Sequence, residues 1–304
     1  MFTSFRFDRF SANAIKLFVI FTAVYFLWFV FAIGIHSNNI SLYLGITALY
    51  FINGSTRKFL YCFAPFFIFL VLYDSLRALH RLNLFEIHTQ DLYYLDKTLF
   101  HLTSEGKQLS LNEYFLQNRN SVLDFLSGAF YLTWVPFPIL FGLYLFVKKR
   151  FALVFNFWLC FLITNLIGFV GYICYPAAPP WYYLEFGAQI IKETSGQAAG
   201  LAWFDEIIGI PIFTNMYTQS AYVFGAMPSL HAAYPIVLSF YSMQYKNKIL
   251  TAIFLCSVFG IWFGAIYTTH HYALDILMGI LCAVLGITIT ERFLVSKLEI
   301  PSEE

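Results

Sequence analysis

The chain has 304 residues, of which 60% are hydrophobic and 21% aromatic, while only 12% carry a charge. This balance is far from that of a soluble domain and predicts an integral membrane protein. A formal net charge of +1 leaves no basic surplus for gripping nucleic acid, so nucleic-acid partners are excluded.

Apolar runs long enough to cross a bilayer recur along the chain. A helix needs about 20 apolar residues to cross a hydrocarbon core of roughly 30 Å. Eight candidates are present, approximately at residues 15–34, 40–53, 59–73, 122–147, 151–174, 224–243, 250–267 and 272–293. Because the second and third are short, the predicted fold is an all-α, polytopic bundle of about six to eight transmembrane helices.

No repeat, low-complexity linker or second soluble domain is visible, so residues 1–304 are expected to form one integral membrane domain. Residues 1–58 are expected to be accessory N-terminal helices, and residues 59–293 the core. The first apolar run resembles a signal peptide, but it is too long for a typical signal h-region. An uncleaved anchor is therefore expected.

Basic residues in short loops near helix ends favour the cytoplasmic side. With eight crossings, every basic cluster falls on one face: Arg6/Arg9, Arg57/Lys58, Lys148–Arg150, Lys246/Lys248 and Arg292/Lys297. Residues 176–222, with one lysine and four acidic residues, then lie on the non-cytoplasmic side. Residues 74–121 lie there too, and their mixture of charges, leucines and aromatics predicts helices at the membrane interface.

The cysteines lie inside or at the edges of apolar runs, and show neither a paired framework nor a metal-type spacing. They are Cys62, Cys160, Cys174, Cys256 and Cys282. We expect small buried hydrophobic side chains, which leave the redox compartment open.

Two short stretches place ionisable residues at the mouths of apolar runs: "AMPSLHAAYP" (residues 226–235) and "YTTHHYALD" (residues 267–275). His271 and Asp275 are four apart, which predicts that they share one face of a helix. The carboxylate can then accept one imidazole N–H and leave the other ring nitrogen available to attack. His231 begins another helix just after Ser229. Two helix N-termini that face each other would offer N–H groups to a phosphate.

The alternative without a catalytic role is that these histidines are polar residues at the membrane interface. We expect that role for His36, His80, His88 and His101. Ionisable groups at a bilayer edge are costly without a function, which argues against it for His231, His271 and Asp275 together. His270 lies about 100° around the helix from His271, so it is expected to face away from Asp275. Metal binding is the rival use, but no established zinc spacing is present, and no metal or cofactor is expected.

The stretches "PSLH" and "HHYALD" resemble the second and third motifs of the phosphatidic acid phosphatase type 2 superfamily, whose pattern is Pro-Ser-Gly-His followed by His-x-x-x-Asp. Within it, the sequence is most similar to inositol phosphorylceramide synthases and more loosely to sphingomyelin synthases. The resemblance runs over residues 175–275, which would contribute the active site. It implies that His271 forms a phosphohistidine, that Asp275 orients it, and that His231 protonates the leaving alkoxide and later deprotonates the acceptor.

The sequence also departs from the superfamily pattern. Neither "YPAAPPWYY" (residues 175–183) nor "FGAIYTT" before His271 contains the Lys and Arg that phosphatases of the superfamily usually carry. A phosphate monoester carries up to two negative charges and is usually bound by the bidentate guanidinium groups of arginine. The absence of these cations therefore favours a singly charged phosphodiester as substrate. Candidates to bind it by hydrogen bonds are Ser229, Trp181, Tyr182, Tyr267, Thr268, Thr269 and His270. The motif "APPWYY" could equally be an aromatic anchor at the interface.

The expected function is transfer of a phosphoinositol-type head group from a phosphatidylinositol-like phospholipid to ceramide or a similar lipid alcohol. A phosphatase acting on a lipid phosphate or polyprenyl pyrophosphate is the alternative within the superfamily. A non-catalytic transporter or assembly subunit is the alternative from another class, and the complete set of His231, His271 and Asp275 argues against it. Some loop residues could bind a polyol or be merely solvated: Asp205, Glu206, Asn215 and Gln219.

Overall fold

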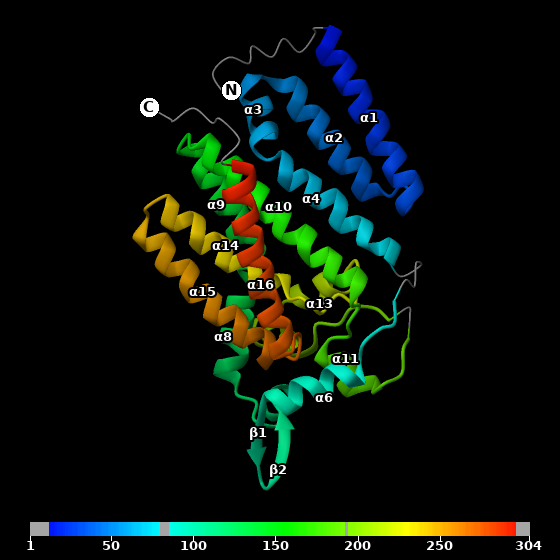
Figure 1. Cartoon of the computed structure of the whole chain (residues 1–304), viewed down its shortest axis with the longest axis vertical. Helices are drawn as coiled ribbons and strands as arrows, with labels where there is room; N and C mark the ends of the chain where they lie inside the picture. The colour runs from blue at the N-terminus through cyan, green and yellow to red at the C-terminus, as the bar shows by residue number, and fades with distance from the viewer. Residues whose placement is uncertain (1–11, 80–84, 192–193, 296–304) are drawn as a thin grey trace.

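The structure is a computed structural model that describes residues 12–79, 85–191 and 194–295 (Figure 1). Arg6, Arg9, His80, Lys192 and Lys297 lie outside these ranges. The principal helices and strands are α1 (Ala12–Ala32), α2 (Ser37–Ile52), α3 (Gly54–Cys62), α4 (Ala64–Ser75), α6 (Gln90–Leu99), β1 (His101–Ser104), β2 (Lys107–Ser110), α7 (Leu111–Gln117), α8 (Ser121–Leu132), α9 (Pro136–Val147), α10 (Phe151–Cys174), α11 (Pro180–Phe186), α12 (Ala202–Ile208), α13 (Ile212–Tyr217), α14 (Leu230–Gln244), α15 (Lys248–Tyr267) and α16 (Ala273–Ile289).

The expected helical membrane bundle is confirmed. Among the described residues, four helices are long and apolar enough to cross a membrane: α1, α10, α15 and α16, the last continued by a short π-helical turn to Leu294. The count reaches six if the bent pairs α3/α4 and α8/α9 are each one span. Helices α2 and α14, with 16 and 15 residues, also follow predicted apolar runs but are shorter than a standard span.

Proline marks both bent spans. The run predicted over residues 122–147 is broken between α8 and α9 with a bend of 42°, and Pro136 opens α9. The run predicted over residues 59–73 bends by 58° at Phe63, and Pro65 follows in the first turn of α4. Proline has no N–H to donate, so it suits the first turn of a new helix and not the interior of a continuous one.

The predicted helix over residues 224–243 is wrong at its start, because α14 begins only at Leu230. The preceding backbone is extended: Ala177 N–H donates to the Phe224 carbonyl (2.8 Å) and Ala226 N–H to the Ala177 carbonyl (3.2 Å). The segment before His231 therefore pairs with the "YPAAPP" stretch. A second unexpected feature is the β1–β2 hairpin, which reverses at Gly106 with φ of +78°.

Helix α10 lies at the centre of the bundle and packs against α4, α9, α14 and α16 (Figure 1). Its Trp158 is fully buried, with ring centroids 4.4 Å from Phe66 and 4.8 Å from Phe157. Aromatic rings thus fill the space between helices, and each buries a large apolar area. Helix α1 lies at the edge of the bundle, where only 11% of its apolar stretch Ile15–Ala32 is buried against the rest of the protein.

The ends of the bundle differ in composition. Figure 1 shows α3, the end of α9, the α14–α15 turn and the end of α16 at one end, and α6 with the hairpin at the other. The described basic clusters of residues 57–58, 148–150, 246–248 and 292 belong to the first end. The turn that joins α15 to α16 lies at the second.

Helices α14 and α16 approach closely where α14 begins. A Cβ atom on Gly279 would lie 2.1 Å from the Ser229 carbonyl oxygen and 3.2 Å from Ala232 Cβ. A backbone carbonyl cannot swing aside as a flexible side chain does. Glycine at residue 279 is therefore required for this contact.

We predict that Gly279→Ala destabilises the fold by about 1–3 kcal/mol through overpacking. The melting temperature of the Gly279→Ala variant in detergent should fall below that of the wild type. Gly45→Ala is the matched control, because a Cβ on this helical glycine meets no heavy atom within 4 Å. Equal melting temperatures for the two variants would contradict the close approach of α14 and α16.

Candidate active site

The turn between α15 and α16, residues 268–272, carries the predicted nucleophile. Thr269 adopts φ of +59°, and the N–H groups of His270 and His271 both donate to the Ala265 carbonyl at 3.0 Å. These bonds reverse the chain within a few residues after α15 ends at Tyr267. His271 is thereby held at the mouth of α16, with its side chain 6% exposed.

Asp275 contacts His271 through the start of α16 and not through a shared helix face, because α16 begins two residues after His271. Asp275 Oδ2 accepts the Tyr272 N–H at 2.9 Å and lies 3.3 Å from His271 Nδ1. The carboxylate, with 0% exposure, caps the helix end and binds the imidazole at once. The predicted pair is thus brought together, although the local geometry differs from the expected one.

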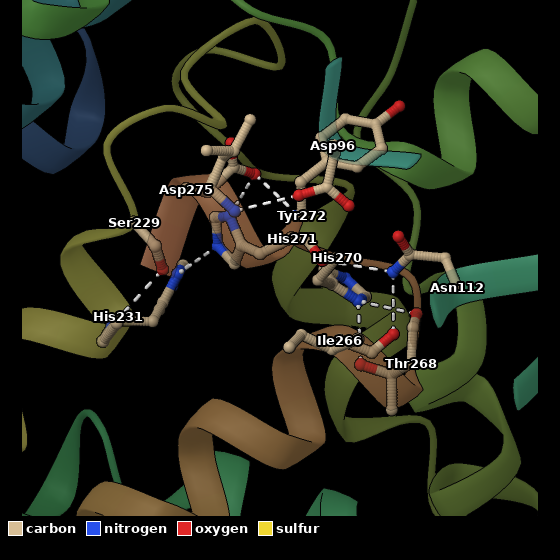
Figure 2. A network of polar contacts seen from close by, with 12 residues as sticks. Asp96, Asn112, Ser229, His231, Ile266, Thr268, His270, His271, Tyr272 and Asp275 are labelled. Carbon is tan, nitrogen blue, oxygen red and sulfur yellow. Dashed lines mark hydrogen bonds and ion pairs between the residues drawn. The ribbon is translucent and has the colours of Figure 1, made fainter. Parts of the chain in front are cut away.

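His231 completes a chain of three side chains (Figure 2). Its Nδ1 lies 3.1 Å from His271 Nε2. Because an ionised Asp275 only accepts, His271 Nδ1 carries a proton and Nε2 keeps its lone pair. His231 Nδ1 must then be the donor, an assignment that follows from the hydrogen-bond network. The nitrogen predicted to attack and a proton donor are thus adjacent.

Ser229 fixes the start of α14 against α16. Its Oγ accepts the Ala232 N–H at 3.3 Å, and its own N–H donates to the Asp275 carbonyl at 2.8 Å. Ser229 is fully buried. One residue therefore caps the helix of His231 and ties it to the residue that orients His271.

The break between α8 and α9 supplies aromatic rings around His231. The rings of Trp134 and Tyr131 lie 4.7 and 5.1 Å from its imidazole. His231 is only partly buried, in contrast to His271 and Asp275. The imidazole of His231 is therefore the more accessible end of this three-residue network, and the partly buried Trp134 packs beside it. The sequence analysis missed both rings, because a break inside a continuous apolar run leaves no periodic signal.

Burial keeps the loop histidines neutral. It lowers the pKa of His271 from 6.5 to about 4, with a hydrogen bond to the Ala226 backbone acting in the opposite direction. It likewise lowers the pKa of His270 to about 3. Both imidazoles are therefore neutral at neutral pH, with one ring nitrogen protonated and the other carrying a lone pair. Nucleophilic attack requires this lone pair.

His270 faces away from Asp275, as predicted (Figure 2). Its Nδ1 lies 3.3 Å from Thr268 Oγ1, and its ring lies 4.5 Å from that of Tyr217. His270 therefore belongs to the packing behind the turn rather than to the His231–His271–Asp275 chain.

Several predicted substrate-binding hydroxyls already have protein partners. The Tyr182 hydroxyl bonds backbone groups of residues 189–191, and the Tyr267 hydroxyl donates to Asp124 at 2.6 Å. Thr268 Oγ1 donates to the α15 backbone at 2.7 Å. These bonds give each hydroxyl a structural role, and their contact with substrate stays a prediction.

Trp181 and Thr269 lie where the segments around residues 181 and 200 meet the turn of residues 268–272. The Trp181 N–H donates to the Thr269 carbonyl at 3.0 Å, and the Gly200 N–H donates to the Thr268 carbonyl at 3.1 Å. The "APPWYY" stretch is thus fastened directly to the turn that carries His271. Substrate contact by the Trp181 and Thr269 side chains stays a prediction.

Of the residues suggested for a polyol, Asp205 has a structural explanation. Its carboxylate accepts the N–H groups of Phe213 and Thr214 and the Thr214 hydroxyl, at 2.8–3.0 Å. It therefore holds the start of α13. Glu206 is 67% exposed and lies 3.6 Å from Arg119.

The two helix N-termini contribute unequally to an anion site. At α16, the N–H groups of Tyr272 and Leu274 donate to Asp275 and Asp96. At α16 these two N–H groups are therefore engaged by protein carboxyl groups, and phosphate binding at the start of α14 stays a prediction. Within the described ranges, no lysine or arginine pairs with Ser229, His231 or Asp275, and no group of three His, Cys, Asp or Glu is placed to hold a metal ion.

The sequence analysis also missed Asp96 on α6 and Asn112 on α7. Both side chains are buried, and both bond the backbone around the catalytic turn. Single polar residues in an amphipathic segment carry no spacing signal, so nothing in the sequence separates them from their solvated neighbours.

Sequence comparisons agree with this geometry. The family model of the PAP2 superfamily matches residues 93–289, which is more than half of the chain and includes His231, His271 and Asp275. The chain belongs to the PAP2 superfamily. The resemblance drawn from "PSLH" and "HHYALD" is thereby confirmed.

Individual PAP2 relatives are inositol lipid enzymes. The chain is 42% identical over 269 residues to the phosphoinositol dihydroceramide synthase of Bacteroides thetaiotaomicron, covering 88% of each protein. It is 30% identical over 178 residues to the inositol phosphorylceramide synthase catalytic subunit of Saccharomyces cerevisiae, covering 56% of this chain and 43% of that protein. It is 28% identical over 180 residues to the inositol phosphorylceramide synthase of Candida albicans, covering 53% and 35%. Less than half of either fungal protein is matched, and no solved structure matches significantly.

We predict that His271→Ala abolishes turnover. Among His231, His271 and Asp275, only His271 has a ring nitrogen with a free lone pair and a carboxylate that orients the ring. Asp275→Asn should leave the protein folded but misdirect the tautomer of His271, a type of change that costs about 10⁴ in a serine protease triad. Turnover is measured in membranes, alongside the melting temperature in detergent. His101→Ala, at an exposed position on β1, is the control. Near-normal activity of His271→Ala would rule it out as the nucleophile.

Proposed function

We propose that this protein transfers a phosphoinositol-type head group from a phospholipid to ceramide or a closely related lipid alcohol. The observation that carries the proposal is the chain from Asp275 through His271 to His231, with the His271 Nε2 lone pair facing a proton donor. The names of its relatives supply the substrate class, since they refer to phosphoinositol and ceramide.

In the first half-reaction, His271 Nε2 attacks the donor phosphorus. The N–P bond forms, and the P–O bond to the diacylglycerol oxygen breaks. His231 enters this step as the imidazolium, with a proton on each ring nitrogen. When the phosphoryl group enters between His231 and His271, His231 Nδ1–H protonates the leaving alkoxide, which leaves His231 neutral. Asp275 stabilises the positive charge that develops on the His271 ring.

In the second half-reaction, the now neutral His231 removes the proton from the acceptor hydroxyl with Nδ1 and returns to the imidazolium form. The acceptor oxygen attacks phosphorus, the new P–O bond forms, and the N–P bond to His271 breaks. One phosphodiester is exchanged for another, so no net input of energy is needed. Phosphohistidine chemistry of this kind uses only residues that this chain supplies.

The surroundings favour a lipid acceptor over water. Residues next to the catalytic side chains are apolar and buried, among them Phe224, Ala226, Leu230 and Tyr272. A lipid alcohol held beside the intermediate has a high effective concentration, and this advantage can reach many powers of ten. Water entry is restricted by the same burial.

We predict that purified protein consumes phosphatidylinositol slowly without acceptor and faster when ceramide is added. The product should retain the head-group phosphate, as read by labelled-lipid chromatography. A chelator should not inhibit. If donor consumption is equally fast without acceptor and water-soluble inositol phosphate accumulates, transfer is ruled out in favour of hydrolysis.

We also propose that the site faces the non-cytoplasmic side. The described basic clusters lie at the end of the bundle opposite to the catalytic turn, and basic loops favour the cytoplasm. Donor and acceptor would then meet at the outer leaflet.

Cysteine labelling tests this orientation. In a background lacking the exposed Cys174 and Cys256, Thr103→Cys on β1 should react with an impermeant maleimide added to the non-cytoplasmic side. Lys149→Cys, exposed between α9 and α10, should react only after permeabilisation. The reverse pattern would overturn the orientation.

A further inference from the structure

Each polar group of His271 has a partner, and one partner comes from outside the catalytic unit. The His271 N–H donates to Ala265 O (3.0 Å), and its two ring nitrogens contact Asp275 and His231. The His271 carbonyl accepts from Asn112 Nδ2 at 3.1 Å. Asn112 lies on α7, 159 residues earlier in the chain.

Asn112 joins the two ends of the turn. The same Nδ2 donates to the Ile266 carbonyl in the last turn of α15 at 2.8 Å (Figure 2). One amide thus bridges the end of α15 and the backbone of the nucleophile. Asn112 is 1% exposed, so water does not compete for these bonds.

Asp96 holds the other side of the turn. Its Oδ1 accepts the Leu274 N–H in the first turn of α16 at 3.0 Å. It is fully buried, and Figure 2 shows it beside Tyr272 and Asp275. Burial raises the pKa of Asp96 to about 7, and the Asp275 charge acts in the same direction.

An ion pair and a hydrogen bond connect the helices that carry Asp96 and Asn112. Their neighbours Lys97 and Glu113 form an ion pair at 2.8 Å, and the Tyr93 hydroxyl donates to the other Glu113 oxygen at 2.7 Å. This network ties α6 to α7 and fixes the spacing between the two contacts. Partly buried, hydrogen-bonded pairs resist screening better than exposed ones.

We infer that Asn112 and Asp96 are positioning residues for the reaction, which clamp the turn from both sides so that His271 Nε2 keeps its line of attack. The inference rests on the proposed role of His271 as nucleophile. Neither side chain touches the reacting atoms. Each leaves one buried oxygen, Asn112 Oδ1 and Asp96 Oδ2, without a hydrogen-bond partner. Burying such an atom is costly, so these residues are poor choices for mere packing.

Asn112→Ala removes both bonds of the amide. We expect kcat to fall by up to about 100-fold, because misplacing a reacting group by about 1 Å can cost that much. The KM for donor should change little, since the outward-facing His231 side of the site is untouched. Asn118→Ala, which removes an exposed amide at the end of the same helix, is the matched control and should keep kcat within about two-fold.

Asp96 provides a second variant pair that remains informative if Asn112→Ala fails to fold. Asp96→Asn keeps an acceptor for the Leu274 N–H and resembles the protonated carboxyl, so kcat should be retained. Asp96→Ala loses the acceptor, so kcat should fall while KM holds. Asp96→Leu fills a similar volume without an acceptor. A fall of kcat in Asp96→Leu as well as in Asp96→Ala, with kcat retained in Asp96→Asn, is the outcome that a packing role does not produce.

A readout independent of turnover separates this inference from the proposed function. The ring nitrogen signals of His271 in protein with ¹⁵N-labelled histidine, assigned by their loss in His271→Ala, report its tautomer and hydrogen bonds. They should shift or broaden in Asn112→Ala and Asp96→Ala, and remain in place in Asn118→Ala. Absence of phosphoinositol transfer in the wild type would reject the proposed function alone. Unchanged His271 signals with wild-type kcat in Asn112→Ala, or equal behaviour of the two Asp96 variants, would overturn the clamp.

Discussion

The site depends on one buried carboxylate at the start of α16. Asp275 is fully buried, and an isolated charge in such a place would be prohibitive. The Tyr272 N–H, the positive end of the helix and His271 Nδ1 compensate for it. Because the carboxylate can only accept, it dictates which nitrogen of His271 carries the proton. The nucleophilic lone pair and the direction of the His231 proton follow from that single assignment.

Burial of this carboxylate requires three helices to approach one another closely at the membrane edge. Gly279 lets α16 meet the Ser229 carbonyl, and Ser229 N–H in turn bonds the Asp275 carbonyl. On α10, a Cβ at Gly168 or Gly171 would lie within 2.6 Å of Leu230 or Pro228. The residues just before His231 are thus held between two glycine faces. Elsewhere, where helices are further apart, aromatic rings fill the gap.

The long helices α10, α15 and α16 follow the predicted apolar runs to within a few residues, because an uninterrupted run permits little else in a bilayer. The proximity of His231, His271 and Asp275 was also predictable, since their motifs are local, while their catalytic roles stay a prediction. The failures share a different cause. Residues 224–229 are apolar enough for a helix, but Phe224 and Ala226 bond the backbone of Ala177, about 50 residues earlier. The contact of Asn112 with the turn of residues 268–272 spans 159 residues. Neither partner is visible from a local pattern, because period and propensity describe which face is buried and not what it meets.

The electrostatics of the two helix ends explain why a singly charged substrate suits this site. A helix N-terminus is equivalent to roughly half a unit of positive charge. At α16 the carboxyl groups of Asp275 and Asp96 interact with this charge, because they accept hydrogen bonds from the N–H groups of Tyr272 and Leu274. Only the start of α14 and the His231 proton remain to face a substrate. A phosphate monoester would bring up to two negative charges toward a site whose nearest acidic side chain is that of Asp275. A phosphodiester brings one, which the α14 terminus and a hydrogen bond from His231 can balance without lysine or arginine. In the proposed mechanism, the carboxylate that orients His271 therefore also favours a phosphodiester over a phosphate monoester as substrate.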